Sequence, residues 1–163
     1  MTARLRFRSP VGLLTVEASE DGVFGLSFGD RGAPRAGVSA RARAHVDAAE
    51  AALVAYFAGR PPTLPLLDLR GTPYQRRVWE ALLAIAWGET RTYGEIAGAL
   101  GGAGARGARA VGGANHVNPV AILVPCHRVV QARGRLGGYG GGVEVKRWLL
   151  AHEAGHAAAL RPA

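Results

Sequence analysis

The sequence is poor in cysteine, and only Cys126 occurs among its 163 residues. A single cysteine excludes an internal disulfide and any metal site built from several thiolates. Cys126 is therefore either a buried side chain that behaves as a small hydrophobe or a reactive thiol. Composition alone favours the first alternative, so a reactive thiol needs support from the neighbouring residues.

Long apolar runs and lysine are also scarce. The run AILV before Pro125 is far shorter than the roughly 20 apolar residues that span a bilayer, and the N-terminal RLRFRSPVG has no apolar signal core. We therefore expect a soluble, cytoplasmic protein. Nineteen of the 20 basic residues are arginine, a side chain that suits forked contacts with phosphates.

Basic residues outnumber acidic ones and give the chain a formal net charge of +8. Such a charge points to a polyanionic partner such as nucleic acid or an anionic surface. The excess is uneven, because residues 1–70 carry a net charge of +2 and residues 71–163 one of +6. We expect the partner to bind the C-terminal part of the chain.

The chain divides into two predicted domains, 1–70 and 71–163. In the first, apolar residues alternate in three short stretches that are interrupted at Pro10 and at Asp21, which predicts a meander of strands. Apolar positions at helical spacing predict a helix over 44–59. The first domain is thus a small antiparallel sheet with a helix, and the fold class is α+β.

The second predicted domain is helical. Thr72 before Pro73 is an N-cap signal for a helix that extends to Gly88. Helical spacing predicts three further helices, over 93–100, 105–115 and 143–152. The first two of these are joined by the glycine-rich stretch GGAG, which gives a helix-turn-helix outline.

The helix predicted over 105–115 has small side chains on one face, where Arg109 is followed by Gly112 and Gly113. Each interior glycine destabilises a helix by roughly 1 kcal/mol relative to alanine. This face of small side chains therefore calls for an explanation. One reason is close packing against a neighbouring helix. The other is that the helix backbone approaches the surface of a binding partner closely, with Arg109 as the one long side chain that extends toward it. The sequence leaves both open.

The run VAILV predicts a buried strand that ends at Pro125, before Cys126 and His127. On a regular strand these last two side chains would point to opposite faces. His127 could then activate the thiol only through a turn or a bridging water, which disfavours a cysteine protease. At this stage a core cysteine beside a surface histidine is the simpler interpretation.

Glu153 lies near the end of the helix predicted over 143–152. The negative end of the helix dipole disfavours an acid there by roughly 0.3–1 kcal/mol, so Glu153 needs hydration or a cationic partner. Hydration is the simpler alternative. Pairing with His127 would instead create a Cys-His-Glu relay that favours the thiolate of Cys126.

Three segments, in this order, resemble the O6-alkylguanine-DNA alkyltransferases: GTPYQRRVWEALLAIAWGETRTYGEIA, RAVGGANHVNPVAILVPCHRVV and GRLGGYGGGVEVKRWLLAHE. They cover about half of the chain, and SPVGLLTVEASEDGVFGLSF resembles the family's smaller domain. The resemblance implies single-turnover repair, in which an alkyl group moves from O6 of a flipped guanine, or from O4 of thymine, to the protein.

The resemblance also implies a role for each catalytic residue. Cys126 would accept the alkyl group, and His127 would be its water-mediated base. Glu153 would orient His127, and Asn118 would brace the cysteine turn. Tyr93 would donate a proton to the leaving guanine and help rotate the nucleotide.

The same resemblance implies the contacts with double-stranded DNA. The helix of small residues over 105–115 would lie in the minor groove, with Arg109 filling the gap that the flipped base leaves. The other implied DNA contacts are Ala110, Gly113, Ala114, Asn115 and Arg128. The implied base pocket consists of Tyr93, Val129, Tyr139 and Gly140. The carbonyls of Cys126 and Val129 would hold the exocyclic amine.

Few groups suffice for this chemistry. Displacement at an sp3 carbon needs a thiolate in line with the leaving guanine and a proton donor, but no oxyanion hole, metal or cofactor. Stacked DNA hides the target carbon, so the base must be extruded. The thioether product is a poor leaving group, so one monomer should repair one lesion.

Three features depart from the family pattern. The turn GGAGARGA is about two residues longer than usual and lacks a proline. At Gly140 relatives often have a larger side chain, so any hydroxyl contact to O6 is lost and only a backbone N–H can remain. The N-terminal part has no cysteine, so the zinc site of some relatives is absent.

Two other functions compete with repair. Non-catalytic relatives bind lesions without repairing them, but they replace the acceptor cysteine, so Cys126 argues against this alternative. A helix-turn-helix regulator, with PCHR as part of its core, would bind one DNA sequence without regard to damage.

Overall fold

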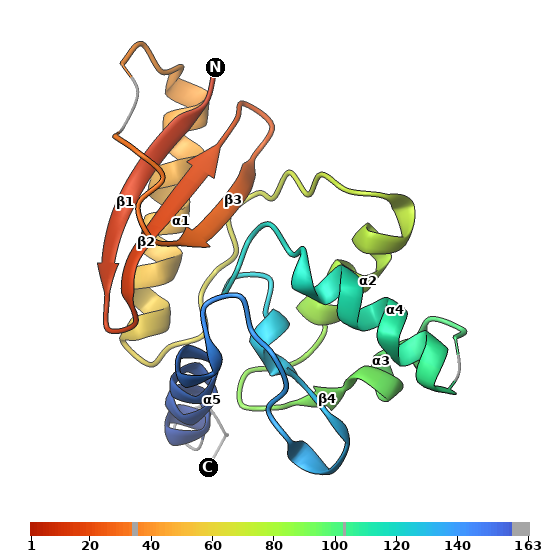
Figure 1. The fold of residues 1–163 in the computed structure, drawn as a ribbon. Coiled ribbons are helices and arrows are strands. Elements are labelled where there is room, and N and C mark those ends of the chain that lie inside the picture. The colour runs from red at the N-terminus through yellow and green to blue at the C-terminus, as the bar shows by residue number, and fades with distance from the viewer. Residues whose placement is uncertain (34–35, 103, 158–163) are drawn as a thin grey trace. The chain divides into compact units, whose positions relative to one another are not determined.

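In the computed structural model, residues 1–33, 36–102 and 104–157 are described. Contacts divide the chain into two compact units. Unit 1 contains Met1–Arg70 and Pro119–Leu123, and unit 2 contains Gly71–Asn118 and the chain from Val124 onward. The units differ from the predicted domains in the segment Pro119–Leu123. The α+β class is confirmed by a three-stranded sheet followed by helices (Figure 1).

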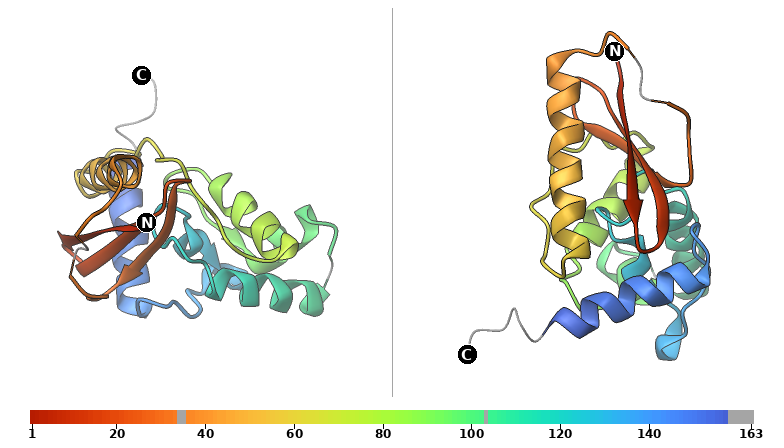
Figure 2. Two further views of the ribbon diagram at one scale, coloured as in Figure 1. Left: turned by 90° about the horizontal axis from the view of Figure 1, so that it is seen from above. Right: turned by 90° about the vertical axis from the view of Figure 1, so that its left-hand side faces the viewer.

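Unit 1 is built on an antiparallel meander, as predicted. Its strands are β1 (Ala3–Ser9), β2 (Gly12–Ala18) and β3 (Val23–Phe28), in the order β1-β2-β3. The helix α1 (Ala40–Phe57) packs along one face of this sheet (Figure 2). It begins four residues before the predicted start, because Ser39 accepts a hydrogen bond from Ala42 N–H as its N-cap.

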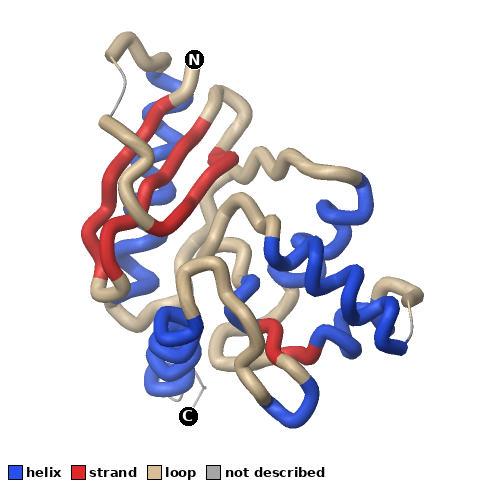
Figure 3. Tube along the Cα trace, viewed as in Figure 1, coloured by secondary structure: helices blue, strands red, loops and turns tan. Residues whose placement is uncertain are grey.

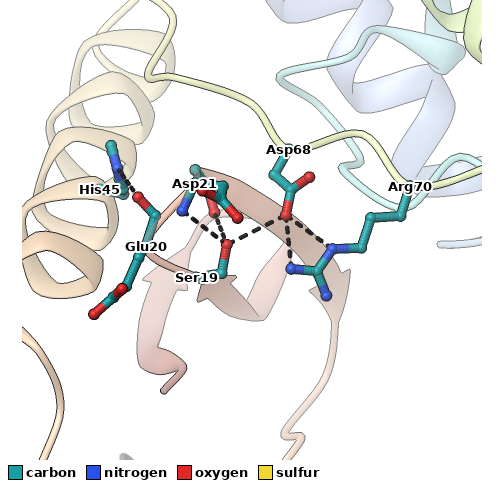
Figure 4. A network of polar contacts seen from close by, with 7 residues as sticks. Ser19, Glu20, Asp21, His45, Asp68 and Arg70 are labelled. Carbon is teal, nitrogen blue, oxygen red and sulfur yellow. Dashed lines mark hydrogen bonds and ion pairs between the residues drawn. The ribbon is translucent and has the colours of Figure 1, made fainter.

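A polar network closes the turn between β2 and β3 (Figure 4). Ser19 Oγ donates to Asp68 Oδ2 at 3.2 Å, and Arg70 Nε donates to the same oxygen at 2.8 Å. In the turn, Gly22 has φ +146°, and a Cβ there would lie 2.7 Å from the Leu66 carbonyl oxygen. Only glycine fits this approach, so the turn is fixed against the segment 66–70.

The strand predicted over VAILV is not formed. Residues 120–124 are buried, but only Val120 makes a bridge, a parallel one with Leu26. Ile122 has φ +69°, and Leu123 N–H donates to the carbonyl of Ala121 at 2.8 Å. The segment is therefore a buried turn. Its apolar composition indicates burial correctly but does not determine the backbone conformation.

Unit 2 contains most of the predicted helices (Figure 3). They are α2 (Pro73–Leu83), α3 (Tyr93–Ala99), α4 (Gly104–His116) and α5 (Val143–Ala157). Two short 3-10 helices, η1 (Cys126–Arg128) and η2 (Ala132–Gly134), lie between α4 and α5. A parallel pair that we did not predict joins β4 (Arg91–Thr92) to β5 (Val129–Val130).

Helix ends differ from the predictions at two places. Thr72 caps α2 through a capping box with Gln75, as its sequence indicates, but the helix ends at Leu83 rather than Gly88. The helix α5 continues to Ala157. Glu153 therefore lies inside α5 and not at its end. The unfavourable helix dipole that we expected at Glu153 is not the reason why it pairs with a cation.

The predicted helix-turn-helix corresponds to α3 and α4, which pack together. A Cβ at Gly107 would lie 3.2 Å from the Ala97 Cβ, so the glycine permits this close approach. Trp79 on α2 donates from Nε1 to the Ala114 carbonyl at 2.9 Å and fixes the far end of α4. The long turn includes Ala103, which is outside the described residues, as are residues 34–35 of the predicted linker.

Among the described residues, no helix is both long and apolar enough to cross a bilayer.

Candidate active site around Cys126

Cys126 opens the 3-10 turn η1, directly after Pro125. Its N–H donates to the Val124 carbonyl at 2.8 Å, and its carbonyl accepts a hydrogen bond from Val129 N–H. Cys126 and His127 therefore do not lie on a strand. Cys126 is 7% exposed and His127 is fully buried, so the alternative of a surface histidine beside a core cysteine is wrong.

A buried relay joins this turn to α5. His127 Nε2 is hydrogen-bonded to Glu153 Oε2, and Arg128 Nε donates to Glu153 Oε1 at 2.6 Å. Arg128 also donates from Nη1 to the Ile85 carbonyl at 2.6 Å. Because a carboxylate only accepts, the proton between His127 and Glu153 belongs to Nε2. His127 Nδ1 is then the nitrogen that can accept a proton.

Arg128 does not lie at the surface, as its predicted role as a DNA contact requires. The residue is 8% exposed, and its guanidinium is engaged by Glu153 and by a backbone carbonyl. A surface phosphate would have to displace both of these partners. Sequence reasoning could not separate a buried arginine from a surface one, because both occur in a basic segment.

Burial determines the resting protonation of Cys126. Desolvation raises the pKa of the Cys126 thiol, and hydrogen bonds from Asn118 and Tyr139 with the charge of Lys146 oppose it only in part. Desolvation likewise lowers the pKa of His127 against the opposing influence of Glu153. The resting pair is therefore neutral. The relay can stabilise the thiolate only when the thiol proton has moved to His127.

Asn118 and Tyr139, which the resemblance assigns to the site, both have side chains hydrogen-bonded with the thiol. Asn118 Nδ2 donates to the Val124 carbonyl at 2.8 Å, which fixes the backbone just before the cysteine turn. The Tyr139 ring lies edge-on to His127, with the ring centroids 6.5 Å apart. A Cβ at Gly140 would meet no described atom within 4 Å, so this position leaves space beside Tyr139.

Tyr93 is the first residue of α3, after the N-cap Thr92. Burial and the nearby Cys126 raise the pKa of its hydroxyl, and a hydrogen bond with the Asn115 side chain opposes them. A Cβ on Gly112 would lie 3.9 Å from the Tyr93 ring. A side chain as small as alanine would therefore fit at Gly112, so packing against Tyr93 does not require a glycine there.

The predicted DNA contacts on α4 fall into two groups. Arg109, Ala110 and Gly113 are exposed, as a binding surface requires. Ala114 and Asn115 are buried at 4% and 7% exposure. They face the protein interior, so we revise their assignment as surface contacts.

Sequence reasoning missed Lys146, which is fully buried on α5. Its ammonium donates to the Val129 carbonyl at 2.7 Å and to the Gly138 carbonyl at 3.4 Å. It thus ties the cysteine turn to the loop that carries Tyr139. The one available signal was that this lysine is the only one in a chain with 19 arginines.

Lys146→Met should move the pH profile of Cys126 alkylation to higher pH. The lost ammonium favours the thiolate, so its removal raises the thiol pKa further. The measurement is the rate of reaction with iodoacetamide against pH. Arg147→Met is the matched control, because Arg147 is exposed and paired with Glu144. If the two variants gave the same pH profile, the charge of Lys146 would have no effect on the pKa of the Cys126 thiol.

The comparisons with known proteins agree on one kind of relative. A family model for 6-O-methylguanine DNA methyltransferase, DNA binding domain, matches residues 73–155. A methylated-DNA–protein-cysteine methyltransferase of Mycolicibacterium paratuberculosis is 50% identical over 154 residues, which are 93% of this chain and 92% of the relative.

Solved structures of Mycobacterium tuberculosis proteins are similar over nearly the whole chain. The crystal structure of an O6-methylguanine methyltransferase matches with a TM-score of 0.80 at 43% identity, over 100% of this chain and 96% of that one. A structure of the protein OGT in complex with DNA matches with a TM-score of 0.78 at 46% identity, over 93% and 92% of the two chains.

Proposed function

Because this chain belongs to the 6-O-methylguanine DNA methyltransferase family, its reaction is the direct reversal of alkylation damage in DNA, and we propose that Cys126 receives the alkyl group. The observation that carries the assignment is the buried contact of His127 with Glu153 beside the chain's single cysteine. O6-alkylguanine in double-stranded DNA is the proposed substrate. The complete set of groups lies in one chain, which favours a monomer, and we infer that it acts in the cytoplasm.

The proposed transfer is a single in-line displacement. The Cys126 proton passes through a water to His127, and the sulfur attacks the alkyl carbon as the carbon–O6 bond breaks. The leaving guanine takes a proton from Tyr93. Glu153 stabilises the imidazolium of His127 and is itself held by Arg128, so both are positioning residues. The product is a thioether, which the site has no means of cleaving.

The choice of substrate is tested with two lesions placed at the same position of one duplex. We expect faster single-turnover transfer from O6-methylguanine than from O4-methylthymine, because Tyr93 and the Cys126 turn are proposed to fit a purine. Faster transfer from the thymine lesion would overturn the proposed specificity, and transfer from neither would overturn the proposed reaction.

DNA binding is assigned to the exposed face of α4. Arg109, Ala110 and Gly113 are exposed there, in the part of the chain with a net charge of +6, and the similar M. tuberculosis OGT has been solved with DNA. A small-residue face lets a backbone approach a groove closely. Arg109 is the long side chain proposed to replace the flipped base.

Arg109→Ala should slow repair of duplex DNA strongly and leave reaction with a free alkylated guanine base nearly unchanged. Unstacking a base costs a few kcal/mol, and Arg109 offsets part of that only in a duplex. Both substrates are compared by single-turnover rates on one preparation. Arg106→Ala is the charge-matched control on the same helix. It should weaken binding and lower the salt slope, without slowing transfer at saturating protein. Equal slowing of Arg109→Ala on both substrates would show that Arg109 supports the pocket instead.

A further inference from the structure

The last turns of α5 carry two histidines at the spacing of a metal-binding motif. Residues 152–156 read HEAGH, and the pattern H-E-x-x-H on a helix places both histidines on one face, four residues apart. The structure agrees, because His152 and His156 are both partly exposed and their ring centroids lie 4.6 Å apart. The alkyl transfer proposed above uses neither side chain.

The glutamate of this motif is engaged elsewhere. In metalloproteases with the same pattern, the glutamate is the general base beside the metal. Glu153 is instead 1% exposed and is bonded to His127 and Arg128 in the buried relay. A hydrolase of that kind is therefore excluded, and the two histidines are the part of the motif that solvent can reach.

Hydrogen bonding determines which nitrogen of His156 can bind a metal. Its Nδ1 lies 2.7 Å from the His152 carbonyl oxygen. A carbonyl only accepts, so Nδ1 carries the proton, and in the neutral ring Nε2 holds the lone pair. Metal-binding histidines usually donate their other N–H to a carbonyl or carboxylate, which fixes the tautomer and the ring orientation. His156 is therefore oriented to bind a metal through Nε2.

Aromatic neighbours hold the ring of His152 in place. It stacks on Trp148, with centroids 4.8 Å apart and an interplanar angle of 16°, and the Trp87 ring meets it at 66°. Stacking covers the face of the ring, whereas a metal binds at its edge. Two imidazoles on one tetrahedral zinc ion, with Zn–N bonds of about 2.0–2.1 Å, have centroids roughly 5 Å apart. The 4.6 Å between His152 and His156 is close to this separation.

From this geometry we propose that His152 and His156 together bind one divalent cation of the class that prefers imidazole, such as Zn²⁺. Within the described part of the chain, no group of three histidine, cysteine or carboxylate side chains could hold a metal. The pair therefore supplies two ligands, and water completes the coordination. Because both ligands lie on one helical turn, the bound ion crosslinks the turn that contains Glu153 and stabilises the C-terminal end of α5.

The test is a calorimetric titration of the protein, prepared without an affinity tag, with Zn²⁺. We expect one ion per chain, and no binding of Mg²⁺, which prefers oxygen ligands. His156→Gln should weaken Zn²⁺ binding at least about tenfold, because even the loss of a residue that only orients a ligand lowers metal affinity about 10–100-fold. His116→Gln is the matched control, since His116 is exposed at the end of α4, and it should leave the affinity unchanged.

Two further measurements separate this site from the thiol and from a general effect on the fold. Cys126→Ser should bind Zn²⁺ as tightly as the unaltered protein, because the proposed ligands do not include the sulfur. Saturating Zn²⁺ should raise the midpoint of thermal unfolding by roughly 5 °C in the unaltered protein but not in His156→Gln. Equal Zn²⁺ affinity in His156→Gln and the unaltered protein would overturn the proposal. Loss of binding in Cys126→Ser, or no binding at millimolar Zn²⁺, would overturn it as well.

Discussion

Replacing Cys126 by serine will abolish alkyl transfer and leave the binding of alkylated DNA intact. The serine hydroxyl is a much weaker acid than the thiol, and the relay cannot create an alkoxide at neutral pH. We expect the single-turnover rate to fall by at least about 10³-fold. Cys126 is small and buried, so the substitution changes little volume and the fold should persist.

The measurement pairs two assays on one preparation. Transfer is followed by the loss of O6-methylguanine from a duplex, and binding by titration of the same duplex. Retained transfer in the serine variant would show that another residue accepts the alkyl group. Loss of binding in a variant that still unfolds cooperatively would mean that the thiol contributes to lesion recognition.

Glu153→Gln should lower both the transfer rate and the stability of the fold. Glu153 is buried between His127 and Arg128, and removing one partner of a buried ion pair costs about 3–5 kcal/mol. The neutral amide also stabilises the His127 imidazolium less, so we expect about 10²-fold slower transfer. The pH profile of Cys126 alkylation should move to higher pH, because the thiolate loses the support of a charged relay.

A double variant separates these two effects. In Glu153→Leu with Arg128→Met both charges are removed together, and a buried pair replaced by apolar side chains is often neutral or stabilising. Stability measured by urea unfolding should return toward that of the unaltered protein, while transfer stays slow. Recovery of the transfer rate along with stability would reduce Glu153 to a structural role.

The sequence predicts those elements whose ends carry a local signal. Thr72 with Pro73 marks the start of α2, and the breaks at Pro10 and Asp21 mark the strand meander. The start of α1 was placed too late, because the buried face of its first turn is formed by Ala42, a small residue with a weak apolar signal. The pairing of β4 with β5 was missed, since two residues per strand show no alternation.

The resemblance names the residues of the site but does not say how they pack. The resemblance brought together Cys126, His127 and Glu153, and the structure places the last two in contact. The burial of Arg128 and of Asn115 depends on which side of a turn or helix faces the core, and neither residue type signals that by itself. A non-local contact such as Lys146 with the Val129 carbonyl leaves no pattern in one sequence.

The most direct test of the account is the intact mass of the protein after reaction with excess duplex that contains O6-methylguanine, followed by peptide mapping. We predict that each molecule gains one methyl group, that the group lies on Cys126, and that repair stops when every molecule is modified. Repaired DNA in excess over protein, or a methyl group on any other residue, would contradict the assignment of Cys126 as a single-use acceptor.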